Sequence, residues 1–505
     1  MAKRAGTRTK RGGLPRVTTG VKGLDAVLCG GLPRGGVYLV AGMPGTGKST
    51  LASQLCFEAA RRGERAIFMT LLSESHTRLL TNMSLFDFFD EGALAASVAY
   101  VSGFATLMDR GLEGVLELIR QELKRRKAEI LVIDGFVALD QVGRSAVEIK
   151  RFVHELQVLA EMVGATVVAT TSQPLETMQP ERTMVDGIVE LSYVRRDAHV
   201  CRTLEVHKLR GSPYLSGAHT FHIDGDGLTV EPRIEALLSA PSREDACIAA
   251  KTTTGVPRLD KILGGGLACG TTTMILGPSG AGKTTLGLQF LCASTPEEKG
   301  VFFGVYETPP RLEYKAGAIG LDLQKQVARG VVSLMWKPMT GATIDGLGHA
   351  ILDEVTRTGA KRLMIDGLDG FRRAAAYPDR VVHFFTALAN ELRVRGVTTL
   401  YTSETAALVG PNVESPLSGV SALVENLIFM RFVEMDARLH RLVSVLKVRD
   451  TSYDSNVYEF RISADGIDVA DTFTSAENVL TGFATKREPQ PRRPPTDGKG
   501  RTRRR

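Results

Sequence analysis

Two stretches of the chain have the residue types and spacing of a phosphate-binding loop. Residues 42–49 read GMPGTGKS and residues 277–284 read GPSGAGKT, so both fit the pattern G-x-x-x-x-G-K-[ST]. In such a loop the glycines let backbone N–H groups converge on phosphate oxygens, while the lysine reaches the terminal phosphates and the hydroxyl binds Mg²⁺. An apolar run precedes each loop and a helix-compatible segment follows, so a helix N-terminus can add its dipole. The two loops predict binding of ATP with Mg²⁺.

The two loops belong to a longer internal duplication. At a constant offset of 235 residues, Thr19-Gly20-Val21 matches Thr254-Gly255-Val256, Leu24-Asp25 matches Leu259-Asp260, and Gly30-Gly31-Leu32 matches Gly265-Gly266-Leu267. This period is far too long for a solenoid repeat. A chain of 505 residues is long enough for each copy to bury its own core. The sequence therefore predicts two tandem domains of the same α/β class.

Carboxylates follow two predicted strands in each copy. The apolar run 65–72 is followed by Glu74, and the run 301–305 by Glu307. Parallel sheets place their ligands at the carboxyl ends of the strands, where such a carboxylate can orient the water that attacks the γ-phosphate. The alternative for each is a solvated glutamate at a strand end. Asp134 and Asp366 each close a further apolar run, which is the Walker B pattern of a carboxylate that holds Mg²⁺.

Two further motifs recur late in each copy. The predicted strands 165–172 and 397–404 end in hydroxyl residues that could sense the γ-phosphate, although the strand preference of threonine explains them nearly as well. A K-x-R motif follows, with Lys208 and Arg210 in one copy and Lys447 and Arg449 in the other. Two cations at this spacing suit a polyphosphate, and we expect them to reach a neighbouring subunit's nucleotide. The alternative is an exposed basic edge that limits strand aggregation.

The positive net charge of +7 is concentrated at the two ends. Residues 1–16 carry six basic residues and no acid, and residues 486–505 carry nine basic residues against two acids, so removing these contributions leaves about −6 for the body. We expect both tails to be disordered and able to bind nucleic acid, acidic partners or a membrane surface, or to act only as solubilising ends. No run of eighteen apolar residues and no signal peptide occurs, which favours a cytoplasmic protein. The six cysteines lack C-x-x-C spacing, which argues against a zinc site.

The duplicated order of motifs resembles the RecA-like ATPases of the KaiC family, named after the circadian clock protein. The resemblance covers about residues 14–475 and rests on T-T-G-V-x-x-L-D, the phosphate loop, the strand-end glutamate, the Walker B aspartate and K-x-R. It implies two tandem RecA-like P-loop NTPase domains, each a mostly parallel twisted sheet flanked by helices. It also implies a homo-hexameric double ring with ATP bound between subunits.

The resemblance also assigns residues to roles. It implies that Lys208, Arg210, Lys447 and Arg449 reach the ATP of the adjacent subunit, that Glu74 and Glu307 are catalytic, and that Ser49, Asp134, Thr284 and Asp366 hold Mg²⁺. The implied phosphate contacts are Gly42, Gly45, Thr46, Gly47, Lys48, Ser49 and Thr50 in the first copy and Gly277, Gly280, Ala281, Gly282, Lys283, Thr284 and Thr285 in the second.

The chain departs from the family pattern in two places. Where relatives show a pair of glutamates, Ser73 precedes Glu74 and Tyr306 precedes Glu307. Where the clock protein has adjacent serine and threonine phosphoacceptors, this chain has Ser421 followed by alanine. We therefore expect ATP hydrolysis in both domains, with serine/threonine autophosphorylation weak or absent and, if present, confined to residues 415–421.

Three functions are consistent with these residues. The first is a ring ATPase that acts as a signalling or regulatory switch on an unidentified partner protein. The second is a RecA/RadA-like DNA-acting motor, which the basic tails favour, and the third is a non-catalytic scaffold held together by ATP. We expect a basic tail over residues 1–13, the first domain over 14–235, a linker over 236–250, the second domain over 251–475 and a basic Pro/Gly-rich tail over 476–505.

Overall fold

The computed structural model describes most of the chain and divides it into two compact units. The first unit comprises Met1–Pro241 with Ala342–Ala350 and Ala374–Leu388, and the second comprises the rest. The described residues are 14–73, 76–94, 96–143, 145–173, 184–196, 199–239, 250–405, 424–435, 438–449, 451–472, 476–477 and 485–486.

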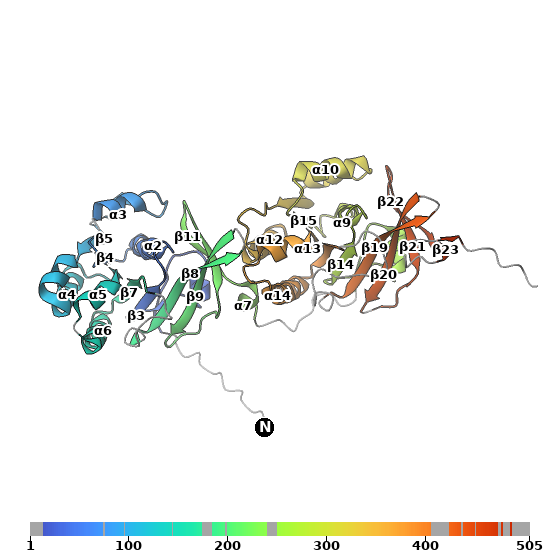
Figure 1. The fold of residues 1–505 in the computed structure, drawn as a ribbon. Helices are drawn as coiled ribbons and strands as arrows, with labels where there is room; N and C mark the ends of the chain where they lie inside the picture. The colour runs from blue at the N-terminus through green and yellow to red at the C-terminus, as the bar shows by residue number, and fades with distance from the viewer. Residues whose placement is uncertain are drawn as a thin grey trace, which may run out of the picture. The chain divides into compact units, whose positions relative to one another are not determined.

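The first unit is built on a nine-stranded sheet with the order β11-β10-β9-β8-β3-β7-β6-β4-β5 (Figure 1). The strands from β8 to β5 are parallel to their neighbours, and β9, β10 and β11 extend the sheet in antiparallel fashion. The strands are β3 (Val37–Ala41), β4 (Ala66–Thr70), β5 (Val98–Ser102), β6 (Ile130–Asp134), β7 (Thr166–Thr171), β8 (Gly187–Arg196), β9 (His199–Leu209), β10 (His219–Asp224) and β11 (Gly227–Glu231).

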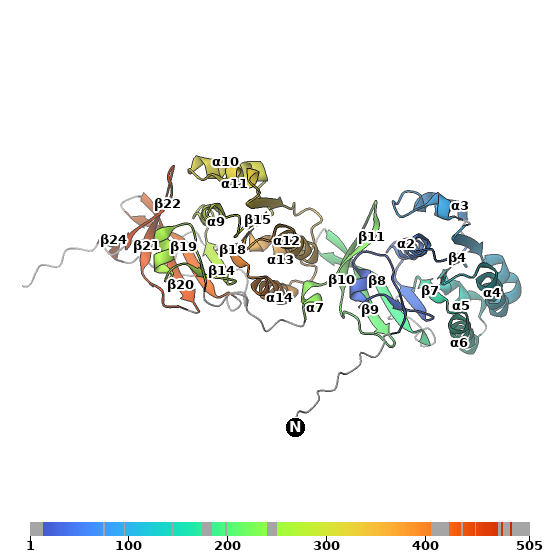
Figure 2. The same ribbon diagram turned by 180° about the vertical axis from the view of Figure 1, so that it is seen from behind.

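Helices cover both faces of this sheet, which explains why its central strands are apolar without interruption. Phe68 packs in the core beneath α2, whereas its neighbours Ile67 and Met69 pack in the core beneath α4 and α6, as strand alternation requires. The same layering is visible from behind (Figure 2). The helices are α1 (Leu24–Val27), α2 (Lys48–Arg61), α3 (His76–Met83), α4 (Phe104–Arg126), α5 (Leu139–Val142), α6 (Ala146–Val163) and α7 (Ile234–Leu237).

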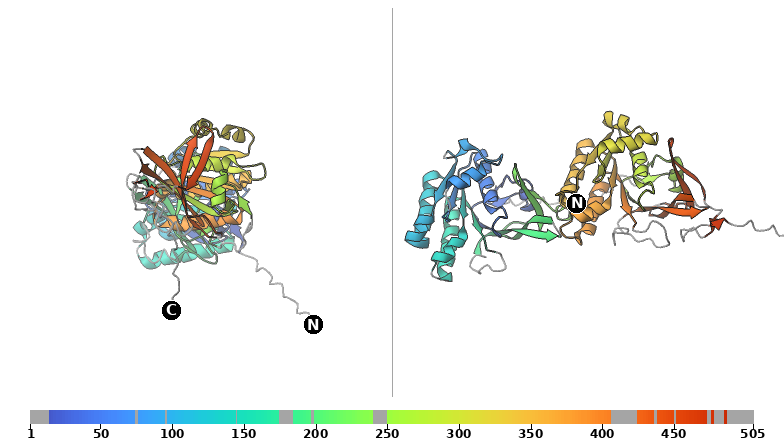
Figure 3. Two further views of the ribbon diagram at one scale, coloured as in Figure 1. Left: turned by 90° about the vertical axis from the view of Figure 1, so that its right-hand side faces the viewer. Right: turned by 45° about the horizontal axis from the view of Figure 1, so that its top comes forward.

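The second unit repeats this sheet with the order β16-β15-β17-β18-β14-β19-β20-β21-β22 (Figure 3). Its strands are β14 (Thr272–Gly277), β15 (Gly300–Gly304), β16 (Val332–Trp336), β17 (Arg362–Asp366), β18 (Thr398–Glu404), β19 (Asn426–Met435), β20 (Arg438–Val448), β21 (Val457–Ser463) and β22 (Gly466–Thr472). The helices of the second repeat are α8 (Pro257–Ile262), α9 (Lys283–Cys292), α10 (Pro309–Ala318), α11 (Leu323–Ala328), α12 (Ile344–Thr358), α13 (Leu368–Ala374) and α14 (Arg380–Val394). The predicted α/β class with two tandem RecA-like domains is confirmed.

A short two-stranded sheet precedes each large one and explains the T-T-G-V-x-x-L-D motif. Its strands are β1 (Arg16–Val17) with β2 (Leu32–Pro33) and, in the second repeat, β12 (Lys251–Thr252) with β13 (Leu267–Ala268). Asp25 accepts hydrogen bonds from the backbone N–H and the hydroxyl of Thr19, both at 2.8 Å. Asp260 accepts the same pair from Thr254 at 2.8 and 2.7 Å. The motif therefore ties the chain entering each domain to its first helix.

The predicted tails lie mostly outside the described residues. Within the C-terminal one, Ala476–Glu477 (β23) pairs with Thr485–Lys486 (β24) in antiparallel fashion. Among the described residues, no helix is long and apolar enough to cross a membrane.

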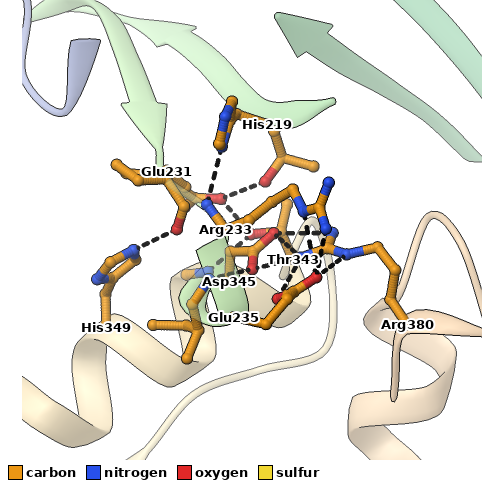
Figure 4. A network of polar contacts seen from close by, with 12 residues as sticks. His219, Glu231, Arg233, Glu235, Thr343, Asp345, His349 and Arg380 are labelled. Carbon is orange, nitrogen blue, oxygen red and sulfur yellow. Dashed lines mark hydrogen bonds and ion pairs between the residues drawn. The ribbon is translucent and has the colours of Figure 1, made fainter. Parts of the chain in front are cut away.

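A buried ion-pair network lies beside α7 within the first unit (Figure 4). Arg380, at the start of α14, donates to Glu235 at 2.7 Å and to Asp345 at 2.8 Å. The side chain of Asp345 is fully buried, and it also accepts the backbone N–H of Ile234 at 3.2 Å. Arg233 also pairs with Glu235 at 3.1 Å, so two guanidiniums balance two carboxylates that have little access to water. The network thus holds α7 against the first turns of α12 and α14.

We expect Arg380→Met to destabilise the protein by about 3–5 kcal/mol, because it leaves the fully buried Asp345 carboxylate without a counter-charge. Chemical unfolding of the wild type and the variant would measure the loss. Arg151→Met is the matched control, since the Arg151 side chain is 68% exposed in its pair with Glu155. Equal midpoints for Arg380→Met and the wild type would contradict a stabilising role for the network.

Candidate nucleotide-binding sites

Both phosphate loops lie at the carboxyl-terminal edge of a central strand and lead directly into a helix. The first connects β3 to α2, and the second connects β14 to α9. Gly47 and Gly282, the last residues before these helices, have φ angles of 106° and 104°. A Cβ atom at Gly47 would come within 2.5 Å of Ile223, and one at Gly282 within 2.9 Å of Ile462. Only glycine fits these positions, because both the backbone conformation and the space exclude a side chain.

The loop lysines take the same position in both repeats. Lys48 donates to the carbonyl oxygens of Gly42 and Met43 at 2.8 and 2.9 Å, and Lys283 donates to those of Gly277 and Pro278 at 2.9 and 2.8 Å. Burial lowers the pKa of both lysines below the ordinary value. The two carbonyl oxygens compensate the positive charge of each lysine only in part, and a bound phosphate oxygen would supply a full counter-charge.

The Walker B aspartates lie within hydrogen-bond reach of the loop hydroxyls. Ser49 donates to Asp134 at 3.2 Å, and Thr284 donates to Asp366 at 3.0 Å. A hydroxyl and a carboxylate that meet at the edge of a phosphate loop are the protein ligands that Mg²⁺ takes in such sites. The described residues contain no group of three or more His, Cys, Asp or Glu that could hold a metal, as expected for an ion that binds mainly to nucleotide and water. The two pairs therefore fit Mg²⁺.

A threonine from the next strand positions each aspartate. Thr170 on β7 donates to Asp134, and Thr402 on β18 donates to Asp366 at 2.6 Å. Burial raises the pKa of Asp366 above its ordinary value, while its hydrogen bonds from Thr402 and Thr284 act in the opposite direction. Both threonines thus bind the aspartate, whereas the sequence suggested that hydroxyls on these strands sense the γ-phosphate.

Of the two strand-end glutamates, Glu307 lies within the described residues. Glu307 forms an ion pair with Lys315 on α10, and its Oε2 atom is buried without a hydrogen-bond partner among the described residues. Tyr306, the residue before Glu307, is 54% exposed and packs its ring against Gly367. Glu74 and the candidate phosphoacceptor Ser421 lie outside the described residues.

Two residues of the antiparallel hairpins contact the loops and were missed by the sequence analysis, as were the partners against which they pack. Tyr193 on β8 donates to the Gly45 carbonyl oxygen, and Arg441 on β20 donates to that of Gly280 at 3.2 Å. Each belongs to an aromatic–arginine pair whose cation lies over the ring, Arg202 over Tyr193 at 5.7 Å and Arg441 over Phe432 at 5.6 Å. In both repeats the arginine follows the aromatic residue by nine positions, and this equal spacing was the available sequence signal.

The first K-x-R motif lies at the edge of the sheet opposite its own phosphate loop. The backbone N–H of Arg210 donates to the carbonyl oxygen of Asp186 at 2.7 Å, and the Asp186 carboxylate accepts the N–H of Val37 at 3.0 Å. Val37 begins β3, whereas the phosphate loop begins after Ala41 at its other end. Five residues of extended strand span about 16 Å. The side chains of Lys208 and Arg210 therefore lie away from the nucleotide site of their own domain.

The second K-x-R motif repeats this placement. Lys447 pairs with Leu427, which pairs with Met274 near the start of β14, and Arg449 follows toward the same edge. The phosphate loop begins at Gly277, at the opposite end of β14. A β-bulge precedes the lysine in both repeats, where it changes the direction of the strand end.

The remaining loop residues lie where the motif requires. Thr46 and its counterpart Ala281 are buried inside the loops, whereas Thr50 and Thr285 lie half-buried in the first turns of α2 and α9.

We expect Thr402→Val to raise the Mg²⁺ concentration needed by the second site about 10- to 100-fold, because second-shell partners orient metal ligands. ATP binding would be titrated with Mg²⁺ in chains whose first loop carries Lys48→Ala. Thr399→Val is the matched control, since Thr399 is equally buried on β18 and its hydroxyl bonds only to the Val397 carbonyl at 3.4 Å. An equal Mg²⁺ requirement in both variants would contradict the role given to Thr402.

Comparison with known proteins agrees with this geometry. The model of the family described as "ATPase: KaiC" matches residues 17–235 and again residues 252–473. The circadian clock oscillator protein KaiC of Rippkaea orientalis is 25% identical over 487 residues, covering 94% of this chain and 92% of its own. The circadian clock oscillator protein KaiC 1 of a Synechocystis species is 25% identical over 489 residues, covering 94% and 93%. The chain belongs to the KaiC ATPase family.

Proposed function

We propose that both repeats bind ATP with Mg²⁺ and hydrolyse it, and that this turnover serves as a regulatory switch in a cytoplasmic ring. The observation that carries the proposal is the preservation of lysine, hydroxyl and aspartate in both sites with nearly equal contacts. A scaffold that bound ATP only for assembly would not need a glutamate after the second apolar run of both repeats. The family assignment also favours a regulatory ATPase over a DNA-acting motor.

The residues of each site have separate roles in phosphoryl transfer. Lys48 and Lys283 bind the terminal phosphate oxygens, and the loop N–H groups hold the remaining phosphate charge. Mg²⁺ neutralises charge that develops on the phosphate oxygens. Glu74 and Glu307 accept a hydrogen bond from the attacking water and take its proton as the water oxygen bonds to the γ-phosphorus and the bond from phosphorus to the oxygen of the departing ADP breaks. Ser49 with Asp134 and Thr284 with Asp366 hold the ion.

Water is a better acceptor than a side chain in the second site. Transfer to a hydroxyl requires an acceptor in line with the γ-phosphate and a base for its proton, whereas hydrolysis requires only a positioned water. Tyr306 takes the place of one acid, and Ala422 stands where a second acceptor would follow Ser421. We therefore propose hydrolysis as the main activity, with Ser421 as the candidate acceptor of any autophosphorylation.

The K-x-R motifs support assembly into a ring. They lie at the edge of the sheet away from their own loops, so Lys208, Arg210, Lys447 and Arg449 can serve a nucleotide only if another subunit presents it. A homo-hexameric double ring, with ATP at each subunit interface, satisfies this requirement. The signalling partner protein would read the state of the ring.

We expect Lys48→Ala and Lys283→Ala each to abolish nucleotide binding in one repeat and to leave the other repeat occupied, because each lysine serves one loop. Native mass spectrometry with Mg·ATP counts the bound nucleotides. Lys315→Ala is a control that removes a cation near the second site without touching the loop. Full occupancy in either loop variant would refute the assignment.

We expect first-site hydrolysis to return when two inactive chains are mixed. One chain carries Lys208→Ala with Arg210→Ala, the other carries Lys48→Ala, and both carry Lys283→Ala to silence the second site. A mixed interface joins an intact loop to an intact K-x-R motif, so the mixture should turn over ATP faster than either chain alone. A rate equal to the average of the separate chains would contradict action between subunits.

A further inference from the structure

The second site contains a carboxylate beside the loop lysine that has no counterpart among the described residues of the first site. Glu404, the last residue of β18, lies with its Oε1 atom 3.7 Å from Nζ of Lys283. In the strand register Glu404 stands opposite Gly277, the first residue of the phosphate loop. The Lys283 side chain is 8% exposed, whereas that of Glu404 is 59% exposed. The carboxylate thus approaches a buried lysine from the solvent side of the loop.

The first repeat has a serine in the corresponding place. Thr171 stands opposite Ala41 in the register of β7 with β3, as Ser403 stands opposite Leu276, so Ser172 occupies the position of Glu404. Among the described residues no carboxylate forms an ion pair with Lys48. Both lysines make the same two carbonyl contacts, so the described surroundings differ in charge rather than in these contacts.

Other carboxylates add to this difference. Asp366 and Asp369 interact electrostatically with Lys283 in addition to Glu404, whereas Asp134 alone is found to do so with Lys48. The γ-phosphate of ATP therefore meets more negative charge when it binds in the second site than when it binds in the first. ADP leaves the terminal phosphate position empty and meets less of this repulsion.

We propose that Glu404 is a specificity-determining residue that weakens the preference of the second site for ATP over ADP. The carboxylate pairs with Lys283 when no γ-phosphate is present and opposes the γ-phosphate for the same cation. Ser172 leaves the lysine of the first site available to the nucleotide. The two repeats would then differ in how long they retain ADP, although their loops have the same design. This inference rests on the proposed binding of ATP at both loops.

The test compares isosteric variants in chains with one working site. Glu404→Gln is placed in a Lys48→Ala chain, and binding is titrated with fluorescent N-methylanthraniloyl derivatives of ADP and of the non-hydrolysable β,γ-imido analogue of ATP, both with Mg²⁺. We expect the triphosphate analogue to bind roughly tenfold more tightly and ADP to change by less than about threefold, since the removed charge faces the third phosphate. The reciprocal change, Ser172→Glu in a Lys283→Ala chain, should weaken the triphosphate selectively.

The outcomes separate this inference from the proposed function. Equal changes for both nucleotides, or none, would overturn the role of Glu404 while leaving nucleotide binding intact. Weaker binding of the triphosphate to Glu404→Gln would also overturn it, because the carboxylate would then be helping to hold the metal–nucleotide complex. Absence of nucleotide binding in both single-site chains would instead refute the proposed function.

Discussion

The structure of both sites depends on an aspartate, buried in the first repeat and partly buried in the second, that receives hydrogen bonds from two different elements. In each repeat the Walker B carboxylate accepts one hydroxyl from the helix that follows the phosphate loop and another from the neighbouring strand. Such a carboxylate is costly to bury unless these donors are in place. The same contacts that satisfy the aspartate therefore fix the strand, the helix and the loop relative to one another, and they leave the carboxylate ready for Mg²⁺.

The parallel sheet explains why these groups meet although they are far apart in the sequence. Strands β3, β6 and β7 run in one direction, so their carboxyl ends bring the loop, Asp134 and Thr170 to one edge. The antiparallel strands that extend the sheet have the opposite consequence for K-x-R. They return the chain to the opposite edge of the sheet, where the Lys208 side chain lies away from the phosphate loop of its own domain. In the proposed ring, the K-x-R cations of one chain would therefore complete the nucleotide site of its neighbour.

Much of the fold and of each site could be predicted from the sequence because the motifs encode local constraints. The phosphate loop requires glycine where φ is positive, and the Walker B aspartate ends an apolar strand. Contacts that arise only from tertiary pairing were not predicted. Tyr193 reaches Gly45 across 148 residues through the register of β8, and Arg380 meets Glu235 across 145 residues. The hydrogen bond from Thr402 to Asp366 was also not predicted, because the sequence does not show which way a buried strand hydroxyl points.

The most direct test of the account is the number of nucleotides bound per chain at saturation. Equilibrium dialysis of the full chain with Mg²⁺ and a non-hydrolysable ATP analogue measures it without reference to oligomeric state or turnover. Because both repeats hold the complete set of lysine, hydroxyl and aspartate, the account predicts two nucleotides per chain, with binding lost when Mg²⁺ is removed by a chelator. Saturation at one nucleotide per chain, or binding that does not depend on Mg²⁺, would contradict it.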